Sequence, residues 1–214
     1  MPITEAARLN LLSPPAGRVR VVLDTDTYNE IDDQFAIVQM LLSPDRFDVE
    51  AIYAAPFFNV VVWLGGHALE WPDTIEFNLK QDVGGAQVLL DSGVPLVLVP
   101  CRGVTSHLHS TVPEIERYVE PHGSIGAFLA MRFKEYSADH LGWAKEIWDM
   151  APVGWLLNPV WAPSVIVPAP ILTDQMTWSI DRRRHAMRYV TSINRNAILR
   201  DFFLKLAAFA ALPR

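Results

Sequence analysis

The sequence predicts an α/β fold with a mostly parallel, open sheet flanked by helices. Short apolar runs rich in Val, Ile and Leu, as at residues 19–23 and 94–99, are typical of buried parallel strands. Segments with helical periodicity lie between such runs. Acidic and amide side chains follow the first strands directly, where open α/β sheets bind ligands. With 214 residues, half of them hydrophobic, we expect one domain over residues 1–214.

The composition excludes several classes of partner. The net charge of −6 argues against a nucleic-acid partner, because phosphate binding requires a basic surface and the sequence shows no sign of one. No run reaches the roughly 18 to 20 apolar residues that span a bilayer, and the N-terminus lacks the pattern of a signal peptide. The single cysteine, Cys101, cannot form an internal disulfide and suits a reducing compartment. We therefore expect a cytoplasmic protein with no nucleic-acid or membrane partner.

The first predicted element is a strand at residues 19–23, bounded by Pro and Gly, and five acids follow it within ten residues: Asp24, Asp26, Glu30, Asp32 and Asp33. So many carboxylates at a strand end repel one another unless a cation or the hydroxyls of a sugar absorb the charge. A hard divalent ion bound by oxygens is the simplest neutraliser. The alternative is that these acids only cap the following helix.

Hydrophobic periodicity and Gly or Pro punctuation predict the remaining elements. We expect helices at 34–42, 82–90, 113–119, 125–136, 143–157 and 195–212, and strands at 49–55, 60–66, 94–99 and 188–193. Residues 158–178 are Pro-rich and predicted to be extended. Thr105 and Ser106 are predicted to cap the helix that follows them. Asp149 lies inside the apolar run 143–157, where an unpaired carboxylate would cost several kcal/mol, so it needs a partner.

Three motifs occur in a characteristic order. The first strand ends in Asp-Thr-Asp, and the pair Asp32 and Asp33 opens the next helix. Glu-Phe-Asn at 76–78 follows a Gly-Gly strand exit, and Trp148 precedes Asp149. Together these motifs resemble the inosine-uridine nucleoside hydrolases, calcium-dependent N-ribohydrolases with a Rossmann-like core and the signature DxDxxxDD. Here two extra residues lengthen that loop.

The resemblance implies a role for each matching residue. Ca²⁺ would be held by Asp26, Asp33 and Asp149, with Asp26 also acting as general base on the attacking water. Asp24 would support this loop from behind. The residues expected to bind substrate are Asp32, Asn59, Glu76 and Asn78 on the ribose, and Trp148 on the base.

Three histidines and two departures from the family complete the site prediction. Many relatives have a histidine where this chain has Trp148. A tryptophan at this position resembles the purine-preferring members of the family, although Trp148 could instead be an ordinary core residue. Glu70 stands where relatives often carry an asparagine. His67 is predicted to be a bystander, and His107 and His109 to lie on the surface.

The chain lacks a connection between two predicted parallel strands. The strand at 49–55 leads through Pro-Phe-Phe-Asn directly into the strand that begins at Val60, whereas parallel strands need a crossover of about a dozen residues or more. The family carries a long segment here. Either the protein has an internal deletion, or a stretch of a longer chain lies between Asn59 and Val60. We favour the second, because both flanks keep the family's character and a deletion would remove the centre of the sheet.

The function that the resemblance implies is hydrolysis of the N-glycosidic bond of a ribonucleoside to free base and ribose, with a preference for purines and a role in purine salvage. The implied partner is a small nucleoside, and the protein would be a homodimer or homotetramer. Two alternatives remain open. One is a relative that binds calcium or ribosides without turnover. The other is a magnesium-dependent phosphohydrolase of the DxDxT type, with Asp24 as nucleophile and Asp26 as acid/base.

Overall fold

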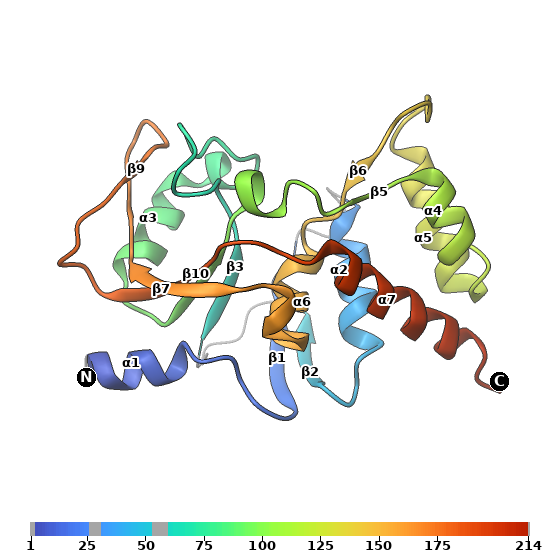
Figure 1. Ribbon diagram of the computed structural model, residues 1–214, viewed down its shortest axis with the longest axis horizontal. Helices are drawn as coiled ribbons and strands as arrows, with labels where there is room; N and C mark the ends of the chain where they lie inside the picture. Colours follow the sequence, from blue (N-terminus) through green and yellow to red (C-terminus); the bar gives the residue numbers. More distant parts are fainter. Residues whose placement is uncertain (1–2, 26–30, 53–59, 214) are drawn as a thin grey trace.

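The computed structural model describes residues 3–25, 31–52 and 60–213 (Figure 1). Its α-helices are α1 (Glu5–Leu11), α2 (Asp32–Leu41), α3 (Val83–Asp91), α4 (Val112–Tyr118), α5 (Gly123–Glu135), α6 (Met150–Leu157) and α7 (Arg195–Ala210). The strands are β1 (Val19–Leu23), β2 (Phe47–Ile52), β3 (Val61–Leu64), β4 (Leu96–Val99), β5 (His109–Ser110), β6 (Lys145–Glu146), β7 (Ser164–Pro168), β8 (Ile171–Leu172), β9 (Trp178–Ser179) and β10 (Ala186–Val190). Short helical turns lie at η1 (Leu79–Gln81), η2 (Cys101–Thr105) and η3 (Pro159–Trp161).

The central strands pair mostly in parallel, which confirms the predicted fold class. β1 pairs with β2 in parallel, and a separate four-stranded sheet has the order β3-β4-β10-β7. Within this second sheet β3, β4 and β10 are parallel, and β7 is antiparallel to β10. β5 with β6 and β8 with β9 form two further small antiparallel pairs.

Side chains on the two faces of the four-stranded sheet enter two different cores. Along β4, Val97 and Val99 pack with helices α6 and α7, whereas Leu96 and Leu98 pack with α3 and β8. This alternation follows from the two-residue period of a strand. All four residues of β4 are buried, which explains why this strand is apolar throughout. In Figure 1, α3 lies to the left of β3, and α2 and α6 lie to the right.

The larger core joins α2, α5 and α7 through aromatic side chains. The ring of Phe35 lies 6.2 Å from that of Phe133 and 5.7 Å from that of Phe202, measured between centroids. All three side chains are fully buried. This packing fixes α2, and with it the two aspartates at the start of that helix.

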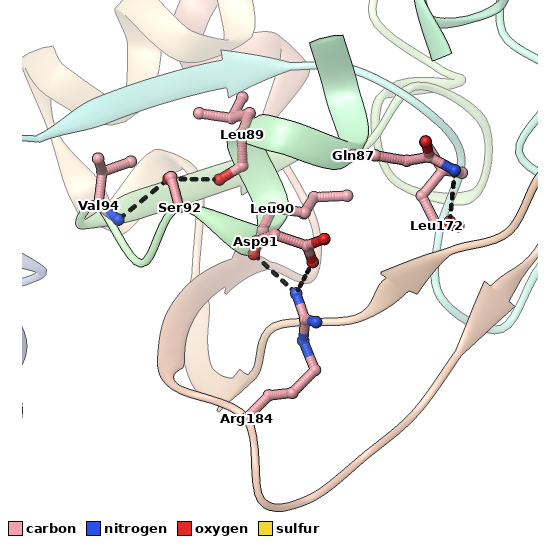
Figure 2. Close-up of polar contacts among 8 residues, drawn as sticks. All are labelled: Gln87, Leu89, Leu90, Asp91, Ser92, Val94, Leu172 and Arg184. Atoms are coloured by element: carbon pink, nitrogen blue, oxygen red, sulfur yellow. Dashed lines mark hydrogen bonds and ion pairs between the residues drawn. The ribbon is translucent and has the colours of Figure 1, made fainter. Parts of the chain in front are cut away.

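Polar contacts fix the C-terminal end of α3 against the strands (Figure 2). Nη2 of Arg184 donates to the carbonyl of Leu90 at 2.8 Å and pairs with Oδ1 of Asp91 at 2.6 Å. Nε2 of Gln87 donates to the carbonyl of Leu172 at 3.2 Å. α3 is thereby tied to β8 and to the turn before β10, at a fixed distance from β3.

Two predictions about secondary structure need correction, and one helix was not predicted. Residues 143–157 do not form one helix, because the structure has β6 first and α6 begins only at Met150. Pro152 in the first turn of α6 is the overlooked signal, since Pro is tolerated there and not deeper in a helix. Thr105 and Ser106 do not cap α4, whose N-cap residue is Thr111. α1, capped by the hydroxyl of Thr4, was not predicted.

The other elements agree with their predictions within a few residues, and the part of the predicted strand 49–55 beyond Ile52 lies outside the described residues. In the described part of the chain, no helix has both the length and the apolar character needed to cross a bilayer.

Candidate functional site

Three carboxylates gather at the N-terminal ends of two packed helices. Asp32 and Asp33 are the first two residues of α2, and Asp149 directly precedes α6, which packs against α2. One carboxylate oxygen from each of the three residues lies within 4.8 Å of the other two. The structure thus places the start of α2 close to Asp149, a residue more than a hundred positions later in the sequence.

The surroundings of this acidic triad, Asp32, Asp33 and Asp149, favour a cation. Asp32 is 9% exposed and Asp33 only 3% exposed, so water screens their mutual repulsion poorly. The partial positive charge at the start of α2 and α6 offsets a part of that repulsion. An all-oxygen set of carboxylates is the donor set that hard divalent cations such as Ca²⁺ or Mg²⁺ take. The residues present therefore fit a bound divalent metal.

Two hydrogen bonds hold the triad in place. The backbone N–H of Trp148 donates to Oδ2 of Asp32 at 3.1 Å. The hydroxyl of Thr25, just after β1, donates to Oδ1 of Asp33. Sequence reasoning missed Thr25, and the available signal was its place inside the Asp-Thr-Asp motif at the strand end.

A cleft of about 1710 Å³ is lined by Asp33 and Asp149 of the triad and by two other predicted site residues, Asp24 and Asn78. Asp24, Thr25, Asp33, Asp149 and Asn78 all line it, together with strand residues of β1 and β3. Asp24 is exposed there. Asp24 and Thr25 directly follow β1, so a part of the polar lining lies at the carboxyl end of a parallel strand, where open α/β sheets bind ligands.

Glu76 and Asn78, two residues apart, have different surroundings. Glu76 is 7% exposed, and its Oε1 and Oε2 accept the backbone N–H groups of Asn78 and Leu79, each at 2.9 Å. Asn78 is exposed and lines the cleft, and its side-chain Oδ1 accepts Nε2 of Gln81 at 3.3 Å. Glu76 therefore builds the turn that presents Asn78 to the cleft.

The Gly-Gly strand exit allows this turn to close. Gly66 has φ +64°, and a Cβ there would lie 2.4 Å from Oγ1 of Thr74. That Oγ1 accepts the backbone N–H of His67 at 2.8 Å, and the carbonyl of His67 accepts Nε1 of Trp178 at 3.0 Å. A side chain at position 66 would separate these partners.

His67 is buried within the loop, at 2% exposure. Its Nδ1 accepts the backbone N–H of Arg102 at 3.4 Å, which requires the neutral ring. Burial lowers the pKa of His67, and the charge of Arg102 lowers it further. His67 therefore supports the loop as a neutral side chain.

Cys101 is a buried cysteine near several of the acidic side chains. It is a free thiol, 2% exposed, in η2 directly after β4. Burial raises the pKa of Cys101 well above its usual value, and the carboxylates of Glu76, Asp149 and Asp32 raise it further. Glu76, Asp32 and Asp149 therefore lie within electrostatic reach of one buried thiol.

Trp148 touches the triad through its backbone, whereas its ring packs against the larger core. Its indole Nε1 is buried and has no hydrogen-bond partner within the described residues. Trp148 is not among the described residues that line the cleft. Its contact with a base stays a prediction.

Glu70 is bound to the four-stranded sheet. The hydroxyl of Tyr189 on β10 donates to Oε2 of Glu70 at 3.1 Å and accepts the backbone N–H of Leu69 at 3.1 Å. Burial raises the pKa of Tyr189 to about 12, with a further contribution from the charge of Glu70. The exchange at this position thus creates a structural contact.

The remaining predicted residues are placed as follows. Asp26 and Asn59 lie outside the described residues. Nε2 of His107 lies 3.0 Å from the carbonyl of Ile193. Among the residues that the structure describes, neither His107 nor His109 belongs to a group that could hold a metal ion.

Comparison with known proteins gives a match of fold without a match of sequence. No family model and no curated protein matches the sequence. A plant nucleoside hydrolase superposes with a TM-score of 0.71 at 14% identity, covering 88% of this chain and 99% of its own. A purine-preferring ribonucleoside hydrolase from Gardnerella vaginalis superposes with a TM-score of 0.67 at 16% identity, covering 90% and 99%. An inosine-guanosine nucleoside hydrolase gives 0.63 at 13% identity, covering 88% and 98%. The chain therefore has the fold of these nucleoside hydrolases, which confirms the structural part of the resemblance.

Proposed function

We propose that this protein hydrolyses the N-glycosidic bond of ribonucleosides, releasing free base and ribose. The observation that supports this most is the acidic triad, of which Asp33 and Asp149 line the cleft, in a fold similar to solved nucleoside hydrolases. Three clustered carboxylates, with the amide of Asn78 lining the same cleft, suit a substrate that carries hydroxyl groups and develops positive charge on its sugar ring.

The proposed metal is Ca²⁺. Asp33 and Asp149 would hold it together with Asp26, and the geometry adds Asp32 to the carboxylates within reach. When bound, the ion would lower the pKa of a water molecule and orient it. Asp26 would accept the proton of that water as general base.

The chain's own polar groups would bind the ribose. Asn78 can donate and accept hydrogen bonds at the cleft surface, and Asp32, Asn59 and Glu76 are proposed to act with it. Asp24 would support the acidic loop. The carboxylates near the ring would stabilise the positive charge of an oxocarbenium-like transition state.

The base is proposed to leave with help from Trp148. Its indole face can stack on a purine but cannot protonate it, so stacking would be the main assistance from this residue. This is the reason for proposing purine preference and a role in purine salvage. A cytoplasmic location and a homodimeric or homotetrameric state stay predictions.

The test is release of base from a panel of purine and pyrimidine ribonucleosides, measured by chromatography with and without a calcium chelator. We expect chelator-sensitive release, fastest for purines, restored by added Ca²⁺. Asp33→Asn should reduce the rate by at least about 100-fold, the upper end of the cost of removing an outer partner of a metal ligand. The matched control, Asp45→Asn on an exposed carboxylate, should leave it unchanged.

Other outcomes would identify the alternatives. Calorimetric binding of Ca²⁺ or a riboside with no base released would favour a non-catalytic relative. Magnesium-dependent release of phosphate from a phosphate monoester, abolished by Asp24→Asn, would favour the phosphohydrolase.

A further inference from the structure

Arg46, in the turn between α2 and β2, binds two distant parts of the chain. Its Nε donates to the carbonyl of Leu156 near the end of α6 at 2.9 Å. Its Nη2 donates at 2.6 Å to the carbonyl of Pro15, in the segment that leads into β1. The backbone carbonyl of Arg46 accepts the N–H of Val19, the first residue of β1, at 2.8 Å. One residue thus joins the end of α6 to the beginning of β1.

At their other ends, the elements around Arg46 carry the candidate site residues. Asp32 and Asp33 begin α2, and Asp149 directly precedes α6. Thr25, which donates to Asp33, comes just after β1. At about 3.3 Å per strand residue and 1.5 Å per helix residue, β1, α2 and α6 are about 17, 15 and 12 Å long. Because α2 and α6 pack side by side (Figure 1) with their first residues at the triad, both helices run from the triad toward Arg46.

The packing between α2 and α6 involves apolar side chains of the larger core, among them Met40 and Val153. Hydrophobic contact is non-directional, so it holds two helices together without fixing how far one lies along the other. A hydrogen bond does fix a position, because it weakens steeply away from its preferred distance and angle. The bond from Arg46 to Leu156 therefore sets where α6, with Asp149 at its start, lies relative to α2.

The guanidinium group is well suited to this place. The carbonyl of Leu156 is one of the last four of α6, and the last four carbonyls of an α-helix have no partner within the helix. The partial negative charge at this end of the helix also favours a cation. A guanidinium holds its N–H donors in a rigid fork, so it can bind two carbonyls at once in a fixed geometry.

We propose that Arg46 is a positioning residue for the acidic triad. By holding the far ends of β1, α2 and α6, it sets the spacing of the three carboxylates and, with it, their affinity for a divalent cation. Such a site tolerates little movement, since Ca²⁺ takes its oxygen ligands within a narrow range of about 2.3–2.6 Å. The inference rests on the metal site of the proposed function and does not depend on the reaction.

The test is calcium affinity, measured by isothermal titration calorimetry, together with thermal unfolding in the presence of a chelator. We expect Arg46→Met to bind Ca²⁺ at least about 10-fold more weakly than the wild type, the lower end of the cost of removing an outer partner of a metal ligand. Electrostatics alone predicts the opposite sign, because loss of a positive charge strengthens the attraction of the protein for a cation. Arg46→Lys keeps the charge but not the fork, so its affinity should lie between those of Arg46→Met and the wild type.

Arg132→Met is the matched control. Arg132 pairs with Glu135 on the same helix, α5, at 2.7 Å, and its loss should not weaken calcium binding. An Arg46→Met protein that unfolds at a lower temperature but binds calcium as tightly as the wild type, or more tightly, would overturn the inference and leave Arg46 a purely structural role.

If Arg46→Met does not fold, Arg46→Lys decides the question: weaker calcium binding supports the inference, and unchanged binding overturns it. A wild type that binds no calcium would overturn the proposed metal site and the inference together. Failure of the inference alone is thereby distinguished from failure of the proposed function.

Discussion

The acidic triad and the loop of residues 65–82 border the same cleft but are held together differently. In the loop, Glu76 accepts from the residues two and three positions later, while His67 and Glu70 bond to Trp178 on β9 and Tyr189 on β10. In the triad, Asp32 accepts from Trp148, 116 positions away. Each carboxylate of Glu70 and Glu76 in the loop thus accepts a hydrogen bond from a neutral donor, whereas the triad depends on the packing of α2 on α6 and brings like charges together.

This difference suggests a division of roles. A loop whose polar groups are already paired provides shape and presents a few side chains, such as Asn78. A buried group of carboxylates is electrostatically unfavourable alone and gains most from a ligand of opposite charge. We therefore expect ligand-dependent stability from the triad and ligand-independent stability from the loop.

The largest expected effect is on stabilisation by calcium. A metal at 100 times its dissociation constant stabilises a folded protein by about 2.7 kcal/mol, and Asp149→Asn should remove most of this gain. Without calcium the variant should be at least as stable as the wild type, because one of three repelling charges is gone. Thermal unfolding with and without calcium measures both quantities.

Asp45→Asn, an exposed control, should keep the full calcium-dependent shift. An Asp149→Asn protein that is as strongly stabilised by calcium as the wild type would contradict the role of the triad.

A smaller effect is expected in the loop. Glu76→Gln places an amide NH₂ against one of two backbone N–H donors, which should cost about 1–3 kcal/mol of unfolding free energy with or without calcium. Asn78→Ala, on the exposed neighbour, should cost little stability and lower the activity. Chemical denaturation and base release measure the two separately. Equal loss of stability in both variants would contradict the division between them.

The sequence predicted local features of the fold well. The run at 19–23 and the helix starting at Arg195 were found because each is marked by its own composition and boundaries. The start of α6 was missed because an apolar run carries no internal boundary, and only Pro152 marked it.

The candidate site could be predicted only in part. The motifs selected Asp33 and Asp149, and the structure places them together, but Asp32 was assigned to the ribose and lies in the same group. The packing of α2 determines which of the two adjacent residues at its start faces a distant partner. No local sequence pattern encodes that packing. The bond between Glu70 and Tyr189 was unpredictable for the same reason, since 119 positions separate the two residues.

The smallest expected effect is a pH dependence from His67. Its folded-state pKa is lowered by burial, so the unfolded chain binds the proton more readily. Above the ordinary histidine pKa of about 6.5, His67 does not reduce the free energy of unfolding. As the pH falls from there toward the lowered folded-state pKa, the free energy of unfolding decreases. His67→Gln removes this titration, so the free energy of unfolding should fall less steeply as the pH decreases below about 6.5. His67 bonds to Thr74, Arg102 and Trp178, none of which belongs to the triad, so its response to pH should be the same with and without calcium. A slope that calcium abolishes would show that the loop and the triad act as one unit.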